Sequence, residues 1–303
     1  MKINLDNVNL GSNSGPNSFA KKLVKYADLS GHSLGSFGDP DVHLCFIESR
    51  RQSFDKPMFQ RLDGIYFNTS QDYNAQNSNI KRTYNMATGV IFQSHFNRQL
   101  ITKFFGEHPN HTVIHNGADL DKILKTQPLA FDKYDNLWSC ASSWRPHKRL
   151  RENIKYFLEH SGPNDGLMIA GSVDIRDRVR HKRIHYVGHL NQKQLFALYK
   201  RSKYFIHLAW LDHCPNVVVD ARACGATIIC TSAGGTKEIA GAEAIVLEES
   251  EWDMSPTNLY APPPLDFSKK SKNNFDNPYC MKLVANKYID FMKKSKIENG
   301  ENQ

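Results

Sequence analysis

The stretch DHCPNVVVDARACGATIICTSAGG, residues 212–235, decides the fold class. It contains a loop with Asp212, a helical pattern that begins near Pro215 and carries Asp220, and a buried strand that ends in paired glycines. Proline suits the first turn of a helix because its missing N–H would have no partner there. A loop, a helix and an apolar strand in this order predict a crossover unit of a parallel sheet.

The same alternation of apolar runs and helical patterns extends outward from this stretch in both directions. Polar, proline-containing residues 126–135 are interpreted as a linker, and Tyr279–Lys293 as a helix that packs on an apolar surface. We therefore predict an α/β chain with two doubly wound parallel-sheet domains, residues 1–128 and 129–260. The predicted strands are 2–5, 42–47, 64–68, 89–92, 112–115, 137–141, 166–171, 184–188, 204–209, 227–231 and 244–247.

Composition narrows the class of protein and its surroundings. The chain has 303 residues, of which 40% are hydrophobic, enough for two modest cores. Lys and Arg exceed Asp and Glu by 39 to 31, a net charge of +8 that favours anionic partners without choosing between nucleotide phosphates, anionic lipid and nucleic acid. The lack of a long apolar stretch or a signal-peptide pattern predicts a cytoplasmic protein, at most peripheral to a membrane. The six isolated cysteines predict reduced thiols and no structural zinc.

Open parallel sheets bind ligands outside the carboxyl ends of their strands, so the residues after each strand matter most. Asp220 is a poor interior helix residue, and it lies four positions after Asn216, on the same helix face. A carboxylate there could accept hydrogen bonds from both ribose hydroxyls, although an ion pair is the alternative. Asp212 could face the ligand or merely cap the helix. Gly234 and Gly235 would allow close approach to a ligand, or form a simple turn.

A basic loop, SSWRPHKR at residues 142–149, follows the strand at 137–141. Three cations at the start of a helix oppose the helix dipole, which suggests that they hold an anion. A diphosphate is the natural candidate, and Trp144 and Pro146 would stiffen the loop around it. The alternative is a solvated basic loop.

Together these pieces resemble the carboxyl-terminal domain of the family 4 glycosyltransferases, the retaining group 1 enzymes of GT-B fold. The family signature E-G-x-P-x-x-x-x-E-A is similar to Asp212–Ala221, and Gly234–Ile239 follows it as in the family. Further similar segments are Gly15–Asn17, Arg61–Gly64, Ile91–Ser94, Val113–Asp119 and Trp144–Leu150.

The resemblance implies two Rossmann-like domains that face each other across a cleft, with the last helix (275–294) crossing back to the first domain. The second domain would hold a nucleotide-sugar donor, with UDP or GDP as the nucleotide, and the first a glycan, lipid or protein-linked acceptor. No cofactor or metal is expected. Lys148 and Arg145 would hold the diphosphate, Asp220 the ribose, Asp212 the donor sugar and Gly188–Leu190 the base. The predicted catalytic residues are Asp212, Lys148 and Arg145. The predicted donor-binding residues are Gly15, Trp144, Arg149, Gly188, His189, Leu190, Pro215, Asn216, Val217 and Asp220, and the acceptor-side residues are Arg61 and Asp63.

Asp212 and Asp220 both replace family glutamates, so a GT-B protein that binds nucleotide sugars or glycans without turnover is an alternative. A nucleotide-sugar epimerase is another, although no carboxylate for proton abstraction can be located. A nucleic-acid role lacks a motif. Helix 16–28 places Lys21, Lys22 and Lys25 beside apolar Phe19 and Leu23, which suits either a membrane surface or packing within a domain.

Overall fold

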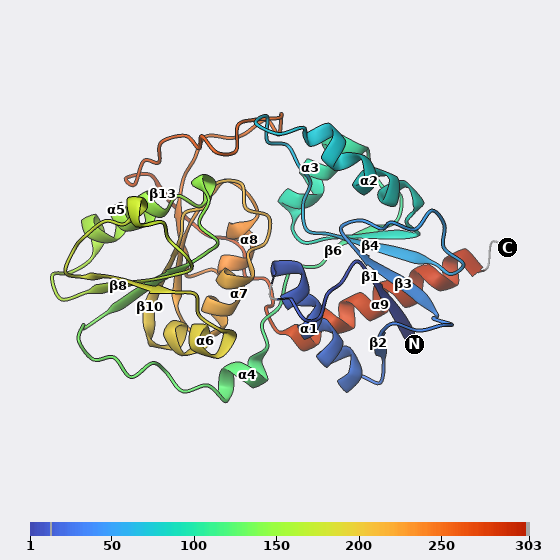
Figure 1. Cartoon of the computed structure of the whole chain (residues 1–303), viewed down its shortest axis with the longest axis horizontal. Coiled ribbons are helices and arrows are strands. Elements are labelled where there is room, and N and C mark those ends of the chain that lie inside the picture. The colour runs from blue at the N-terminus through green and yellow to red at the C-terminus, as the bar shows by residue number, and fades with distance from the viewer. Residues whose placement is uncertain (13, 301–303) are drawn as a thin grey trace. The chain divides into compact units, whose positions relative to one another are not determined.

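A computed structural model describes residues 1–12 and 14–300 and divides the chain into two compact α/β units (Figure 1). Unit 1 comprises Met1–Ala118, Met254–Thr257 and the carboxyl-terminal segment from Pro278. Unit 2 comprises Asp119–Asp253 and Asn258–Asn277. The division falls ten residues earlier than the predicted boundary at 128.

The boundary differs because residues after Ala118 are held by unit 2. Helix α4 (Leu120–Leu124) follows Asp119, whose carboxylate caps it by accepting from the Lys122 N–H (3.2 Å). The Leu129 N–H then donates to the Ala197 carbonyl (2.9 Å). The short helix was not predicted, since five residues show too little periodicity.

Unit 1 is built on a parallel sheet of order β2-β1-β3-β4-β5-β6. Its strands are β1 (Lys2–Asp6), β2 (Ser33–Gly35), β3 (Val42–Phe46), β4 (Met58–Leu62), β5 (Gly89–Phe92) and β6 (His111–Val113). Its helices are α1 (Gly15–Leu29), α2 (Tyr73–Met86), α3 (His95–Phe105) and α9 (Met281–Gly300). Figure 1 shows α2 and α3 on one face of this sheet and α1 and α9 on the other.

The returning helix α9 shares one apolar core with α1. Phe19 and Leu23 of α1 are buried together with Met281 and Tyr288 of α9. Burial of a large apolar side chain stabilises a fold by about 1.5–3 kcal/mol, so this face of α1 is held inside the unit. The suggested membrane surface of α1 is therefore wrong, and Lys22 is itself buried, donating to the Gly117 carbonyl (2.5 Å).

One predicted strand of unit 1 lies elsewhere in the sequence. The strand is Met58–Leu62 rather than 64–68, and it pairs with both β3 and β5. The strand was not recognised because it contains Gln60 and Arg61, and polar residues rarely occupy a strand that is buried throughout. Ile65 and Phe67 are buried, but they lie outside the sheet ladder.

Unit 2 contains a sheet of order β13-β12-β11-β10-β7-β8-β9, parallel except for the edge strand β13. Its strands are β7 (Leu137–Ala141), β8 (Gly166–Ala170), β9 (Ile184–Gly188), β10 (Ser202–His207), β11 (Thr227–Thr231), β12 (Ile245–Leu247) and β13 (Lys270–Lys272). Besides α4, its helices include α5 (Leu150–His160), α6 (Gln192–Arg201), α7 (Asn216–Ala223) and α8 (Thr236–Ala240). The predicted parallel strands of this unit agree closely with these bounds, and β13 was not predicted.

Among residues 1–12 and 14–300, none of the helices combines the length and apolar character needed to cross a bilayer.

Candidate nucleotide-binding site

The sheet of unit 2 changes direction between β7 and β10, which are hydrogen-bonded neighbours. From β7 the chain continues outward to β8 and β9, whereas from β10 it continues the opposite way to β11 and β12. The loops after β7 and β10 therefore diverge and leave a crevice at their carboxyl ends, where doubly wound sheets bind ligands. The two loops contain Lys148 and Asp212.

The loop after β7 ends in a tight 3₁₀ turn (Pro146–Lys148) that presents Lys148. The Lys148 N–H donates to the Arg145 carbonyl (2.8 Å), while the Arg145 side chain is exposed. Trp144 is half-buried and its indole N–H donates to the Ala170 carbonyl (2.9 Å), so it fixes the loop against β8. The basic loop is thus rigid, as predicted for Trp144, and not a freely solvated segment.

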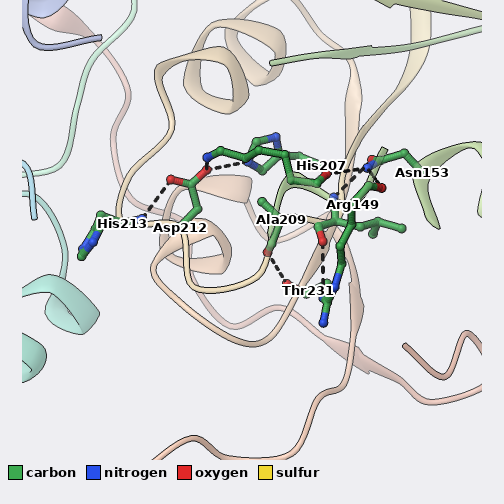
Figure 2. Close-up of polar contacts among 9 residues, drawn as sticks. Arg149, Asn153, His207, Ala209, Asp212, His213 and Thr231 are labelled. Atoms are coloured by element: carbon green, nitrogen blue, oxygen red, sulfur yellow. Dashed lines mark hydrogen bonds and ion pairs between the residues drawn. The ribbon is translucent and has the colours of Figure 1, made fainter. Parts of the chain in front are cut away.

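Asp212 is the centre of the polar cluster in Figure 2. Its Oδ2 accepts from Lys148 Nζ (2.5 Å) and from His207 Nε2 (2.8 Å), and its Oδ1 accepts from the backbone N–H of His213 (3.1 Å). Helix α7 begins after Pro215 and has no side-chain cap. Asp212 therefore does not cap this helix, and its carboxylate instead faces Lys148.

The protonation states of this cluster follow from burial and charge. Burial alone would raise the pKa of Asp212, but the Lys148 ammonium and the His207 hydrogen bond hold that pKa well below its usual value. Burial lowers the pKa of His207, although Asp212 opposes the shift. At neutral pH the cluster thus contains a carboxylate, an ammonium and a neutral imidazole. Because a carboxylate only accepts, the His207 proton is on Nε2.

The paired glycines serve the Asp212 loop. Gly234 has φ +95°, and a Cβ there would lie 2.7 Å from the Asp212 carbonyl oxygen. The Gly235 N–H donates to the same carbonyl (2.8 Å). The close approach predicted from the glycines is therefore between two protein loops, and it fixes the backbone of Asp212.

The other predicted donor-binding residues of unit 2 lie along the same edge of its sheet. Pro215 precedes α7, and Asn216 and Val217 form its first turn, where backbone N–H groups point out of the helix end. Asp220 is half-buried one turn later, and its charge adds to burial in raising the pKa of Tyr199 on α6. Gly188, at φ +69°, is the last residue of β9, and His189 and Leu190 follow it. Their contacts with a donor remain predictions.

Arg149, a predicted donor-binding residue, does not contact the Lys148–Asp212–His207 cluster but extends into the interior of unit 2. Its side chain is fully buried and forms an ion pair with Glu249, with Nη2 2.6 Å from Oε1. The same nitrogen donates to the Pro263 carbonyl (2.8 Å). A guanidinium held in this way cannot reach a diphosphate, so the predicted direct role in donor binding is wrong.

Three predicted residues lie in unit 1. Gly15 is the first residue of α1. Arg61 is buried in the core, where it donates to the Tyr288 hydroxyl (3.0 Å) and to Asn116 Oδ1 (2.9 Å) and pairs with Asp63. Its burial excludes the predicted contact with an acceptor, and Asp63 serves as the partner of Arg61.

Two polar residues of the site were not predicted. His207 is the last residue of β10, where the run Tyr204–Ala209 was interpreted as a buried apolar strand. Asn153 is buried on α5 and its Nδ2 donates to the carbonyls of Lys148 (3.0 Å) and Arg149 (2.6 Å). A polar residue at the carboxyl end of a central strand was the available signal for His207. Nothing in the sequence distinguished Asn153 from a surface asparagine.

Within the described ranges, no three His, Cys, Asp or Glu side chains gather as potential metal ligands. That the activity needs no metal stays a prediction.

Residues 124–255 match the family described as "Glycosyl transferases group 1". The match covers most of unit 2 and includes both carboxylates and the basic loop. No curated protein matches the sequence.

Several solved structures share the fold of the whole chain at low identity. Sucrose-phosphate synthase from Thermosynechococcus elongatus is 12% identical at a TM-score of 0.66, over 83% of this chain and 86% of that one. HepE from Anabaena, solved with UDP and glucose, is 15% identical at 0.63, over 100% and 99%. A glycosyltransferase from Rickettsia africae is 12% identical at 0.63, over 97% and 98%. The fold is therefore GT-B, as predicted.

Proposed function

We propose, from the match of residues 124–255 to the group 1 glycosyltransferases, that this protein transfers a sugar from a nucleoside-diphosphate donor to an acceptor hydroxyl. We further propose that it acts with retention, as in family 4, and that the hydroxyl belongs to a glycan, lipid or protein-linked acceptor. The single observation that carries the proposal is the Lys148–Asp212 pair at the switch point of unit 2.

The geometry suits a leaving nucleoside diphosphate. The bond between the anomeric carbon and the phosphate oxygen would break, with both electrons going to the phosphate. The Lys148 ammonium, the exposed Arg145 and the first-turn N–H groups of α7 would stabilise the charge that develops. The acceptor oxygen would attack the same face of the sugar, and its proton would pass to the departing phosphate.

The ion pair between Lys148 and Asp212 has a direct role in this chemistry. An ammonium that is only 17% exposed would be costly without a counter-charge, and Asp212 supplies one before a donor binds. His207 fixes the carboxylate, which compensates for a side chain one methylene shorter than the family glutamate. The cation is therefore oriented in advance and needs little reorganisation when the diphosphate arrives.

The six cysteines are all free thiols, and burial raises the pKa of Cys230 to about 12. A thiol with a raised pKa is poorly reactive, and free thiols suit a reducing compartment, so we propose a cytoplasmic location.

Binding of UDP, GDP, ADP and their sugar conjugates tests the donor site. Isothermal titration calorimetry on the wild type, Lys148→Ala and Asp220→Ala would use UDP first, since HepE was solved with UDP and glucose. We expect one nucleotide to bind, and both substitutions to weaken it. A folded wild type that binds none of them contradicts the proposal.

Binding of a nucleotide sugar without transfer to any acceptor, and without rearrangement of the sugar, would favour a binding protein. Proton NMR of the product would assign retention from its anomeric coupling.

A further inference from the structure

Arg149 follows Lys148 directly, yet its side chain extends into the interior of unit 2. Its Nη2 contacts Glu249 (2.6 Å) and the Pro263 carbonyl (2.8 Å), and its Nη1 lies 3.4 Å from the Leu208 carbonyl. The side chains of Arg149 and Glu249 are 0% and 4% exposed, so the pair is shielded from water. The Arg149 side chain thus joins the turn after β7, the loop after β10 and the segment that begins at Glu249.

The sequence departs from two ordinary rules at this position. Arg149 has φ 51° and ψ 52°, a left-handed conformation that costs a residue other than glycine about 1–2 kcal/mol. A buried ion pair offsets little of that cost, because desolvation of both charges consumes most of their attraction. Local rules that are broken without a gain in stability mark positions that serve function.

The backbone around Arg149 determines where Lys148 can place its ammonium. The Arg149 N–H donates to the Pro146 carbonyl (3.0 Å), which closes the turn on the far side of Lys148. Asn153 holds the carbonyls of both residues (Figure 2). A lysine side chain is flexible, so the reach of its ammonium depends on where the backbone holds its Cα atom.

We propose that Arg149 is a positioning residue for Lys148. Its ion pair with Glu249 locks the 145–149 turn in the left-handed form, and the locked turn keeps the Lys148 ammonium beside Asp212, ready for a donor diphosphate. The part that concerns the diphosphate rests on the proposed function. The part that concerns Lys148 can be tested without a nucleotide.

Amine reactivity reports the placement of Lys148 directly. Trace labelling with a succinimidyl ester, read by peptide mass spectrometry, would compare Lys148 with Lys155, which is 66% exposed on α5. Arg149→Gly leaves the left-handed backbone accessible but no longer locked, because it removes the whole side chain with its guanidinium. We expect Lys148 to label about fivefold faster, the effect of losing a coupling between neighbours of about 1 kcal/mol. Lys155 should not change.

A second variant guards against failure to fold. Arg149→Gly combined with Glu249→Leu removes both buried charges, so that no unpaired carboxylate is left in the interior. The same acceleration at Lys148 is expected in this variant, and Arg151→Gln, on the exposed face of α5, is the control. Lys148 labelling at the wild-type rate in either folded variant would overturn the proposal.

A double-mutant cycle extends the test to the donor. Arg149→Gly should raise the Kd of the bound nucleotide about fivefold in the wild-type background and leave it unchanged in Lys148→Ala. Equal losses in both backgrounds would mean that Arg149 acts independently of Lys148, and would overturn the proposal. If the wild type binds no nucleotide, the proposed function fails on its own, while the labelling result still decides the role of Arg149.

Discussion

Both units of this protein bury an arginine, and the surroundings of the two differ. Arg61 in unit 1 lies over the rings of Phe19 (4.0 Å) and Phe46 (5.0 Å), in a regular strand. Arg149 in unit 2 sits in a left-handed turn and contacts a carboxylate and two carbonyls. The first arginine fills a core and the second holds a strained loop beside Lys148. Burial therefore does not by itself separate a structural charge from one that supports a site.

The largest expected effect is on the unit 1 arginine. Arg61→Met should lower the free energy of unfolding by about 3–5 kcal/mol, because it leaves the Asp63 carboxylate without its partner in a mostly buried position. Urea unfolding would measure the loss, and Arg61→Met with Asp63→Asn should recover part of it.

The same variant tests whether Arg61 has only a structural role or also contacts a ligand. At a temperature where Arg61→Met is folded, its nucleotide Kd and its kcat should equal those of the wild type. A loss of affinity or turnover in the folded protein would mean that Arg61 takes part in binding or catalysis, as the sequence predicted.

Lys148→Ala should show the opposite pattern. If its ammonium stabilises the departing diphosphate, transfer should slow by about 10²–10³-fold, the usual effect of removing one preorganised electrostatic group. The matched control is Lys155→Ala, an exposed lysine seven positions along the chain. Initial rates at saturating donor would measure the effect, and a rate within twofold of the control would exclude Lys148 from the chemistry.

The two arginines also show how far the sequence predicts this molecule. Apolar runs predicted the parallel strands of unit 2, because each of those strands consists mainly of apolar residues. The pattern failed at β4, where Gln60 and Arg61 are buried and satisfied by distant partners such as Ile47 and Asn116. Lys148 and Asp212 were predicted from their places after strands, since topology alone brings such residues together. The direction of the Arg149 side chain depends on Glu249, one hundred residues away, and no local pattern encodes it.

Stability should also depend on pH through His147, the neighbour of Lys148 in the turn after β7. Burial, and then the charge of Lys148, lower the pKa of His147 to about 3. In the unfolded chain His147 takes up a proton as the pH falls through 6.5, whereas in the folded protein it stays neutral down to about pH 3. The free energy of unfolding is therefore highest above pH 6.5 and declines as the pH falls below that value. The decline is about 1.4 kcal/mol per pH unit, or about 2 kcal/mol at pH 5.

His147→Phe removes that proton and keeps a ring against Tyr260, on which His147 stacks at 6.0 Å. Urea unfolding at intervals between pH 7 and 5 should therefore show a shallower loss of stability in the variant. Buried His207 and half-buried His213 also have lowered pKa values, so the slope should shrink without vanishing. An unchanged slope would show that His147 takes up a proton in the folded protein.

The smallest effect is expected at a third arginine, which lacks the burial of the other two. Arg176 pairs with Asp174 through two side-chain hydrogen bonds (2.7 and 3.0 Å), but its side chain is 85% exposed. Solvent screens such a pair, and both side chains lose conformational freedom in forming it. Arg176→Gln should thus leave the urea midpoint and the nucleotide Kd unchanged. A clear loss of nucleotide affinity in this variant would mean that the loop after β8 takes part in binding, and the charges that matter would then not be limited to those held against Lys148 and Asp212.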